Sequence, residues 1–222
     1  MTAVLRQVGR PEDPALRTRR EGEILEAATR MFAERGYAET QVQLIADELG
    51  VGNGTVYRYF PTKEKLFLAA VERGLNELTE TMDAVMESGA EPLEMMRGAV
   101  RAYLRFFHRR PEMAELFIQE RAAFRDHHRP LYFATKAEDE SKHADFFERL
   151  NSAGLLREIS PERFFSVIGD TLYGIVLTNL LSGRTVDPDE QANGVIDVLF
   201  HGVLSDSAKK KSTKSASKKG AS

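Results

Sequence analysis

Apolar residues recur every three or four positions along most of the chain, which is the spacing that places them on one face of an α-helix. From Pro92 onward, no segment shows the apolar–polar alternation that is typical of a strand. The pattern therefore predicts an all-α fold. The first helix is expected from about Thr18 to Arg35, and Gly36 follows its end. The inward positions of this helix are Ile24, Leu25, Ala28, Met31 and Phe32.

A pair of short helices joined by a tight turn is predicted directly after the first helix. Leu44, Ile45 and Leu49 have the spacing of one apolar helix face. Gly50 follows, where a helix can end in the left-handed conformation that glycine adopts without steric cost. A short polar segment, residues 52–55, then opens the second helix. This arrangement is typical of a helix-turn-helix whose second helix enters the major groove of DNA by its N-terminal end.

Proline and glycine separate the later helices. A long helix begins near Lys63, after Pro61-Thr62, and can continue to about Ser88. At about 1.5 Å per residue, it would be roughly 39 Å long. Further helices are expected at residues 92–110, 111–124, 131–151, 161–182 and 188–204.

Three blocks of the N-terminal region resemble the TetR family of bacterial transcriptional regulators. The blocks are ILEAATRMFAERGY (24–37), IADELGV (45–51) and GTVYRYFPTKEKL (54–66), and the last one is the most specific. Two positions depart from the family pattern. Gln41 stands where a Ser or Thr helix cap is usual, and Leu44 replaces a commonly polar residue. Because a glutamine caps a helix only weakly, Thr40 is the alternative cap. The resemblance implies an N-terminal three-helix helix-turn-helix DNA-binding domain and a C-terminal helical domain for ligand binding and dimerisation.

The resemblance also implies which residues would contact DNA. Gly54 would let the backbone approach the groove, and Asn53 would either pair with a base edge or only initiate its helix. Tyr57 and Tyr59 match aromatic residues that contact phosphates, although Tyr57 could instead belong to the core. Lys63 would hold a phosphate together with the amides at the start of its helix. The expected DNA contacts are Gln41, Gln43, Gly52, Asn53, Gly54, Thr55, Tyr57, Arg58, Tyr59 and Lys63.

The last two helices, 161–182 and 188–204, are apolar around more of their circumference than one core requires. The resemblance implies that both copies of a two-fold homodimer contribute these helices to a four-helix bundle. The alternative is a larger core within a single chain.

A small-molecule effector pocket in the C-terminal domain is likewise implied by the resemblance. Aromatic side chains would supply its surface and a few polar groups its anchors, although aromatics at helical spacing more often form core. The candidates are Tyr103, Phe106, Phe107, Phe117, Arg121, Phe124, His143, Phe146, Phe147, Thr171, Tyr173 and Asn179.

Charge is unevenly distributed along the 222 residues, whose net charge is -3. Residues 1–20 carry +3, residues 206–222 carry +5, and the body between them carries -11. Attraction to a polyanion is therefore expected from the basic arms and the helix ends rather than from the body. The Lys/Ser/Ala-rich tail should be disordered, either as a DNA tether or as a solubilising segment. The predicted organisation is a flexible basic arm (1–17), a DNA-binding domain (18–66), a ligand-binding and dimerisation domain (67–205) and the tail (206–222).

The location is expected to be cytoplasmic. No apolar run approaches the roughly 20 residues that span a bilayer, and the N-terminus lacks the apolar centre of a secretory signal. The absence of cysteine excludes disulfides and cysteine-ligated metal.

The expected function is a DNA-binding transcriptional regulator, a repressor released by a small effector, with no cofactor and no catalytic site. One alternative is a TetR-like protein that marks DNA for another process, which the basic tail supports. Another is a helical-bundle metalloenzyme, since Glu140 and His143 have the E-x-x-H spacing of a di-iron site. That site needs a second E-x-x-H, and the chain contains only this one.

Overall fold

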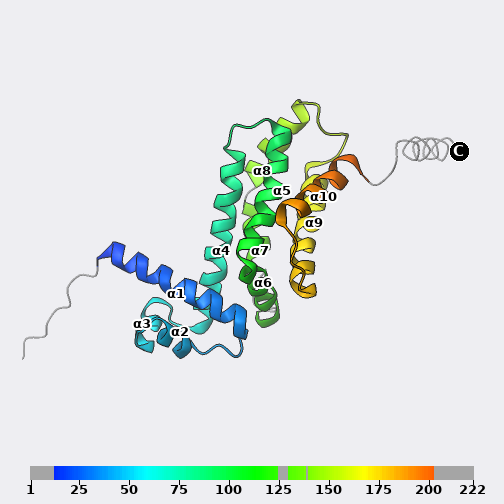
Figure 1. The fold of residues 1–222 in the computed structure, drawn as a ribbon. Coiled ribbons are helices and arrows are strands. Elements are labelled where there is room, and N and C mark those ends of the chain that lie inside the picture. Colours follow the sequence, from blue (N-terminus) through cyan, green and yellow to red (C-terminus); the bar gives the residue numbers. More distant parts are fainter. Residues whose placement is uncertain (1–12, 125–129, 139, 203–222) are drawn as a thin grey trace, which may run out of the picture. The chain divides into compact units, whose positions relative to one another are not determined.

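The computed structural model describes residues 13–124, 130–138 and 140–202, and within these ranges every regular element is a helix (Figure 1). The all-α prediction is confirmed. The predicted arm up to residue 12 and the predicted tail lie outside the described residues. The described helices are α1 (Pro14–Arg35), α2 (Val42–Glu48), α3 (Asn53–Tyr59), α4 (Lys63–Met86), α5 (Pro92–Arg109), α6 (Pro111–Ala123), α7 (Leu131–Glu138), α8 (Glu140–Ser152), α9 (Pro161–Ser182) and α10 (Pro188–His201).

Helix α1 begins at Pro14 rather than at Thr18. The Asp13 side chain accepts a hydrogen bond from the Ala15 amide at 3.0 Å. Pro14 then fills the first helical position, where an amide hydrogen has no helical partner in any case. The prediction that residues 1–17 form a flexible arm is therefore wrong for residues 14–17.

The chain packs into two compact units that differ from the predicted linear domains. The N-terminal unit comprises residues 1–80 and 110–140, and the C-terminal unit comprises residues 81–109 and 141–222. Helix α6, which the sequence assigned to the C-terminal domain, packs against α1 instead, with Gln119 Nε2 donating to the Phe32 carbonyl at 2.9 Å. It also approaches α4 closely, because Met113 occupies the space where Gly74 has no side chain.

The core of the N-terminal unit joins the three helices of the helix-turn-helix to α4 and α6. Ile24, Ile45 and Val56 are fully buried and come from α1, α2 and α3 respectively. An aromatic cluster extends this core. The ring centroids lie 5.0 Å apart for Phe32 and Phe67, 5.1 Å for Tyr37 and Phe67, and 4.9 Å for Tyr37 and Phe124. The buried apolar area from all these helices stabilises the orientation of α2 and α3.

In the C-terminal unit, α5 packs against α9 and α10. A hydrophobic cluster in this unit consists of Met95, Met96, Phe146, Phe147, Leu150 and Phe164. At the surface, Arg105 donates two hydrogen bonds to the Asp189 carboxylate, at 2.6 and 2.7 Å. The hydrogen bonds from Arg105 lower the pKa of Asp189 below its ordinary value.

Helix α9 has the bounds that the sequence predicts, but it is more exposed than a core helix. The statement that no apolar run approaches a membrane span is wrong for α9, because it is long and apolar enough by length and composition. Only 17% of its apolar window is buried in the described residues. Core helices of soluble proteins can be equally long and apolar, so length and composition alone do not place α9 in a bilayer.

The single helix expected at 131–151 is described as α7 and α8, which lie on either side of residue 139. Residue 139 itself is outside the described residues. The last helix, α10, ends at His201 with Gly202 as its C-cap, and residues 203 and 204 of the prediction also lie outside the described range.

Candidate nucleic-acid interface

Helices α2 and α3 and the turn between them form the predicted helix-turn-helix. Gly50 has φ 64°, in the left-handed region that favours glycine. The Val51 amide donates to the Ala46 carbonyl at 3.0 Å, which closes the turn at the end of α2. Gly52 is the N-cap of α3, in an extended conformation and without a side chain that could obstruct an approaching ligand.

Helix α3 divides its residues between core and surface. Val56 is fully buried, and Phe60 at its end is also in the core. Tyr57 keeps 41% of its surface exposed, and Gly54 and Arg58 are also exposed. Of the two roles considered for Tyr57, this exposure agrees with a contact to a partner rather than with a place in the core; the contact itself stays a prediction.

Asn53 is the first residue of α3, directly after its N-cap. The N-cap itself, Gly52, makes no side-chain capping bond at this helix start. The Asn53 Oδ1 atom is shielded from solvent and finds no hydrogen-bond donor among the described residues. A base edge would reach this acceptor only after the side chain turns outward, and that turn would break no hydrogen bond of Oδ1.

The start of α2 differs from the expectation for Thr40. Gln41 is the N-cap and makes no capping bond with its side chain. Thr40 is fully buried, and its hydroxyl donates to the Gly36 carbonyl at 2.7 Å and also lies 3.2 Å from the Met31 carbonyl. The suggestion that Thr40 caps α2 is therefore wrong, because its hydroxyl holds the turn that follows α1. Gln43 is exposed and is held along the helix by Asp47, to which its Nε2 donates at 2.7 Å.

Lys63, the first residue of α4, contacts the turn between α1 and α2. Its Nζ donates to the carbonyls of Ala38 and Thr40, each at 3.0 Å, and lies 4.6 Å from the centroid of the Tyr37 ring. Burial raises the pKa of Tyr37 above its ordinary value, and the charge of Glu64 adds to the shift. An ammonium group has three donors, so one N–H of Lys63 is left for the predicted phosphate.

The expected ligand-pocket residues are distributed over both units, and their place in a pocket stays a prediction. Phe117, Arg121 and Phe124 belong to the N-terminal unit, and the other nine belong to the C-terminal unit. Phe124 packs in the aromatic cluster with Tyr37, and the Phe117 ring lies 5.3 Å from that of Tyr132. The Phe117 and Phe124 rings are both buried, as aromatic residues at helical spacing often are.

In the C-terminal unit, several candidates pack against other aromatic or apolar side chains. On α5, the Phe107 ring packs against the rings of Tyr103 and Phe106. Phe146 and Phe147 belong to the hydrophobic cluster, and the His143 ring lies 4.6 Å from that of Phe165. The remaining polar candidates make bonds of their own. Asn179 exchanges hydrogen bonds with Gln191, and Thr171 donates to the Val167 carbonyl.

Among the described residues, no group of three or more His, Cys, Asp or Glu has the geometry to hold a metal ion. The side chain of Glu140, half of the E-x-x-H pair, lies outside the described residues.

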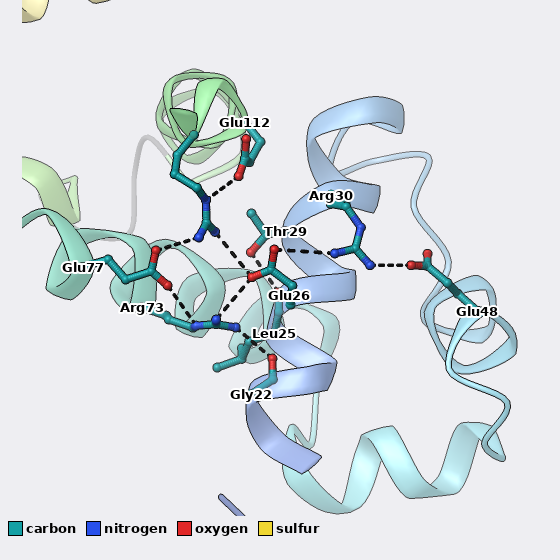
Figure 2. Close-up of polar contacts among 10 residues, drawn as sticks. Gly22, Leu25, Glu26, Thr29, Arg30, Glu48, Arg73, Glu77 and Glu112 are labelled. Atoms are coloured by element: carbon teal, nitrogen blue, oxygen red, sulfur yellow. Dashed lines mark hydrogen bonds and ion pairs between the residues drawn. The ribbon is translucent and has the colours of Figure 1, made fainter. Parts of the chain in front are cut away.

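A network of ion pairs ties the helices of the N-terminal unit together (Figure 2). Arg110, directly before α6, contacts Glu77 of α4 at 2.7 Å, Glu26 of α1 at 3.5 Å, and the adjacent Glu112. Burial would lower the pKa of Arg110, but the hydrogen bond to Glu112 and the charges of Glu77 and Glu26 outweigh it and raise the pKa. The three helices are therefore held by shared charges as well as by apolar contact.

The same network reaches the helix-turn-helix. Arg73 of α4 contacts Glu26 at 3.2 Å, and its Nη1 donates to the Gly22 carbonyl at 2.8 Å. On the other side of Glu26, Arg30 of α1 contacts Glu48 of α2 at 2.7 Å, as Figure 2 shows. A series of ion pairs thus connects α6 and α4, through α1, to α2.

The N-terminal part of the chain matches a known protein family. Residues 24–70 match the model of the bacterial regulatory proteins of the tetR family. The transcriptional repressor KstR2 of Mycobacterium tuberculosis is 39% identical over 79 residues, which cover 36% of this chain and 40% of the repressor. The chain thus matches less than half of the length of that relative.

Two solved structures share the fold over most of the chain. The fatty acid degradation regulator FadR from Bacillus halodurans is 19% identical and covers 82% of this chain and 99% of its own, with a TM-score of 0.68. AibR, solved in complex with isovaleryl coenzyme A and operator DNA, is 24% identical and covers 82% of this chain and 98% of its own, with a TM-score of 0.64. At these identities, the similarity establishes the fold alone.

Proposed function

The chain belongs to the TetR family of bacterial regulatory proteins, and from this membership we propose that it is a transcriptional regulator that binds a two-fold symmetric operator as a homodimer. The observation that carries the proposal is helix α3. It buries Val56 and leaves Gly54, Tyr57 and Arg58 exposed. A recognition helix needs one face fixed to its domain and the other free to enter the major groove.

The residues of α3 suit the two kinds of contact that DNA recognition requires. Gly54 allows close approach of the backbone, and Asn53 brings an acceptor and a donor that match an adenine edge. Tyr57, Arg58 and Lys63 supply groups for phosphates. These assignments support a protein that both positions itself on the duplex and reads its sequence.

Dimerisation is proposed through α9 and α10. Leu181 is 76% exposed, and Val167 and Val198 are each 49% exposed, although all three are large apolar residues. Burying such residues against a second copy removes their surface from water, which favours association. A two-fold axis would place two α3 helices on half-sites about 34–36 Å apart, or on a multiple of that spacing.

We further propose that the regulator is a repressor that a small effector releases from DNA. An effector that binds only one conformation of the chain shifts the population away from the DNA-binding one. Because AibR, which shares the fold, was solved with isovaleryl coenzyme A, acyl-coenzyme A thioesters are the first class of effector to test. The protein would act in the bacterial cytoplasm and without catalysing a reaction.

Selection of binding sites from random double-stranded DNA, with the full chain, tests the proposed function. We expect a two-fold symmetric consensus that is bound at least about a thousandfold more tightly than random DNA at physiological salt. The matched control is a chain that lacks residues 206–222, which should select the same consensus. Weak, unselective binding that disappears with this tail would contradict the proposal, because the tail would then be the DNA-binding element.

A further inference from the structure

Arg17 of α1 lies beside α3, although it is outside every motif of the helix-turn-helix. Its guanidinium carbon is 6.0 Å from the centroid of the Tyr59 ring. The guanidinium carbon of Arg58 is 5.4 Å from the same centroid. Two cationic groups from different helices thus contact one aromatic ring on the helix that is proposed to meet DNA. A guanidinium near a ring face is attracted to it and keeps a restricted orientation.

The charge of Arg17 is not compensated within the described residues. Arg19 and Arg20 both form ion pairs with Glu23, at 3.1 and 2.8 Å. No described carboxylate lies within ion-pair distance of Arg17, whose side chain is exposed. Of the other described acidic residues near it in sequence, Asp13 is the N-cap of α1 and accepts from the Ala15 amide. Glu21 lies four residues further along α1 and forms no ion pair with Arg17 in the described part of the chain. Of the three neighbouring arginines, Arg17 is therefore the one whose charge is available to an external anion.

The position of Arg17 depends on the early start of α1. Because the helix begins at Pro14 instead of near Thr18, Arg17 lies on regular helical backbone, and its amide donates to the Asp13 carbonyl at 3.0 Å. A side chain on a helix is held more closely than one on a mobile arm, so less conformational entropy is lost when it binds.

We propose that Arg17 is a DNA-binding residue that contacts a backbone phosphate next to those held by α3, with Tyr59 as the platform that orients its guanidinium group. This inference rests on the proposed function, because it adds a contact to the same interface. A phosphate fits better than a base, because α1 is not the helix that enters the groove and a planar guanidinium matches phosphate oxygens in pairs. The contact contributes to affinity on every sequence and carries no base preference.

The test compares Arg17→Ala with Arg19→Ala in the full chain. Arg19 is a matched control, because it lies on the same helix and is paired with Glu23. Fluorescence anisotropy on the selected operator, over a series of salt concentrations, gives the slope of log K against log salt. Each lost phosphate contact reduces the magnitude of this slope by about 0.9.

For a dimer, Arg17→Ala should therefore reduce the magnitude of the slope by about 1.8 and lower the affinity at least about tenfold near 0.1 M salt. The loss should be equal on the operator and on operators with single base changes. Arg17→Lys should recover part of the slope, since it restores the charge, and Arg19→Ala should leave the slope unchanged.

Three outcomes would overturn the inference: an unchanged slope for Arg17→Ala, an equal change for Arg19→Ala, or a shift in base preference. Thermal melting of both variants separates these outcomes from misfolding, because an exposed residue should leave the melting temperature unaltered. Failure of the proposed function itself is distinct, since the wild-type chain would then select no symmetric operator.

Discussion

Lys63 and Tyr37 contact each other across the turn that connects α1 to α2, with the ammonium nitrogen 4.6 Å from the ring centroid. The same nitrogen donates to the carbonyls of Ala38 and Thr40. The first residue of α4 thereby fixes the segment that leads into the helix-turn-helix. The family pattern suggests only a phosphate contact for Lys63. These contacts show that it also stabilises the domain in the absence of DNA.

Replacing Lys63 should accordingly impair both folding and binding. Lys63→Met removes two hydrogen bonds from a charged donor and a cation–π contact, so we expect the free energy of unfolding to fall by about 1–3 kcal/mol. Urea unfolding measures the change, and Lys65→Met, at an exposed position of the same helix turn, is the control. If Lys63→Met lost DNA affinity at unchanged stability, the lysine would act on phosphate alone.

Two substitutions in α3 should separate positioning from base reading. Tyr57→Phe removes only a hydroxyl from an exposed ring and should weaken binding similarly on all sequences, because phosphate contacts carry no sequence information. Asn53→Ala should change the preferred base at one position in each half-site, with a discrimination of about 1–3 kcal/mol lost there. Affinities on a panel of mutated operators distinguish the two effects. A uniform loss for both variants would contradict the assignment of Asn53.

The ion-pair network should contribute to the stability of the N-terminal unit. Arg110→Met leaves Glu77 and Glu26 close together without their shared partner, and we expect about 1–2 kcal/mol of destabilisation for this partly buried group. The difference from wild type should shrink at high salt, which screens such charges.

Arg109→Met is the matched control for that variant, because Arg109 is exposed and its side chain donates to the Arg105 carbonyl, with no ion pair to any described carboxylate. Equal destabilisation by the two substitutions, measured by chemical unfolding at low and high salt, would show that the network is not a source of stability.

Charged substitutions on α9 and α10 should dissociate the proposed dimer. Leu181→Glu and Val198→Glu place a carboxylate where apolar burial is expected, so both variants should sediment as monomers and bind the operator more weakly. Leu155→Glu is the control, since Leu155 is also an exposed large apolar residue but lies outside these helices. Wild-type protein that sediments as a monomer at micromolar concentration would contradict the dimer.

The sequence predicts the helices well where proline, glycine and capping residues bound them. Ser160-Pro161 and Asp187-Pro188 start α9 and α10 at the expected residues, and the Asp187 side chain accepts from the amides of Asp189 and Glu190. The same Asp-Pro signal is present at Asp13-Pro14, but the two prolines and the weak periodicity of residues 1–16 favour a flexible arm there. A capping signal thus predicts the start of a helix even where hydrophobic periodicity is weak.

Tertiary relationships were beyond the reach of the sequence pattern. The packing of α6 against α1, and the roles of Thr40 and Arg110, depend on which helices meet in space, and one periodic pattern permits many arrangements. For the same reason the pocket candidates stay a prediction, because periodicity shows that an aromatic residue faces inward but not what it faces. The exposed face of α9 could be anticipated, since its apolar residues exceed what one core requires.

Footprinting of the selected operator with hydroxyl radicals, using the full chain, tests the central claim most directly. If α3 enters the major groove in each half of a dimer, two symmetric patches of protected backbone should appear, centred about 34–36 Å apart or at a multiple of that distance. Arg17→Ala should shorten the protection at the same edge of each patch. A single unsymmetric patch, or protection that depends only on residues 206–222, would contradict a dimeric regulator that reads DNA through its helix-turn-helix.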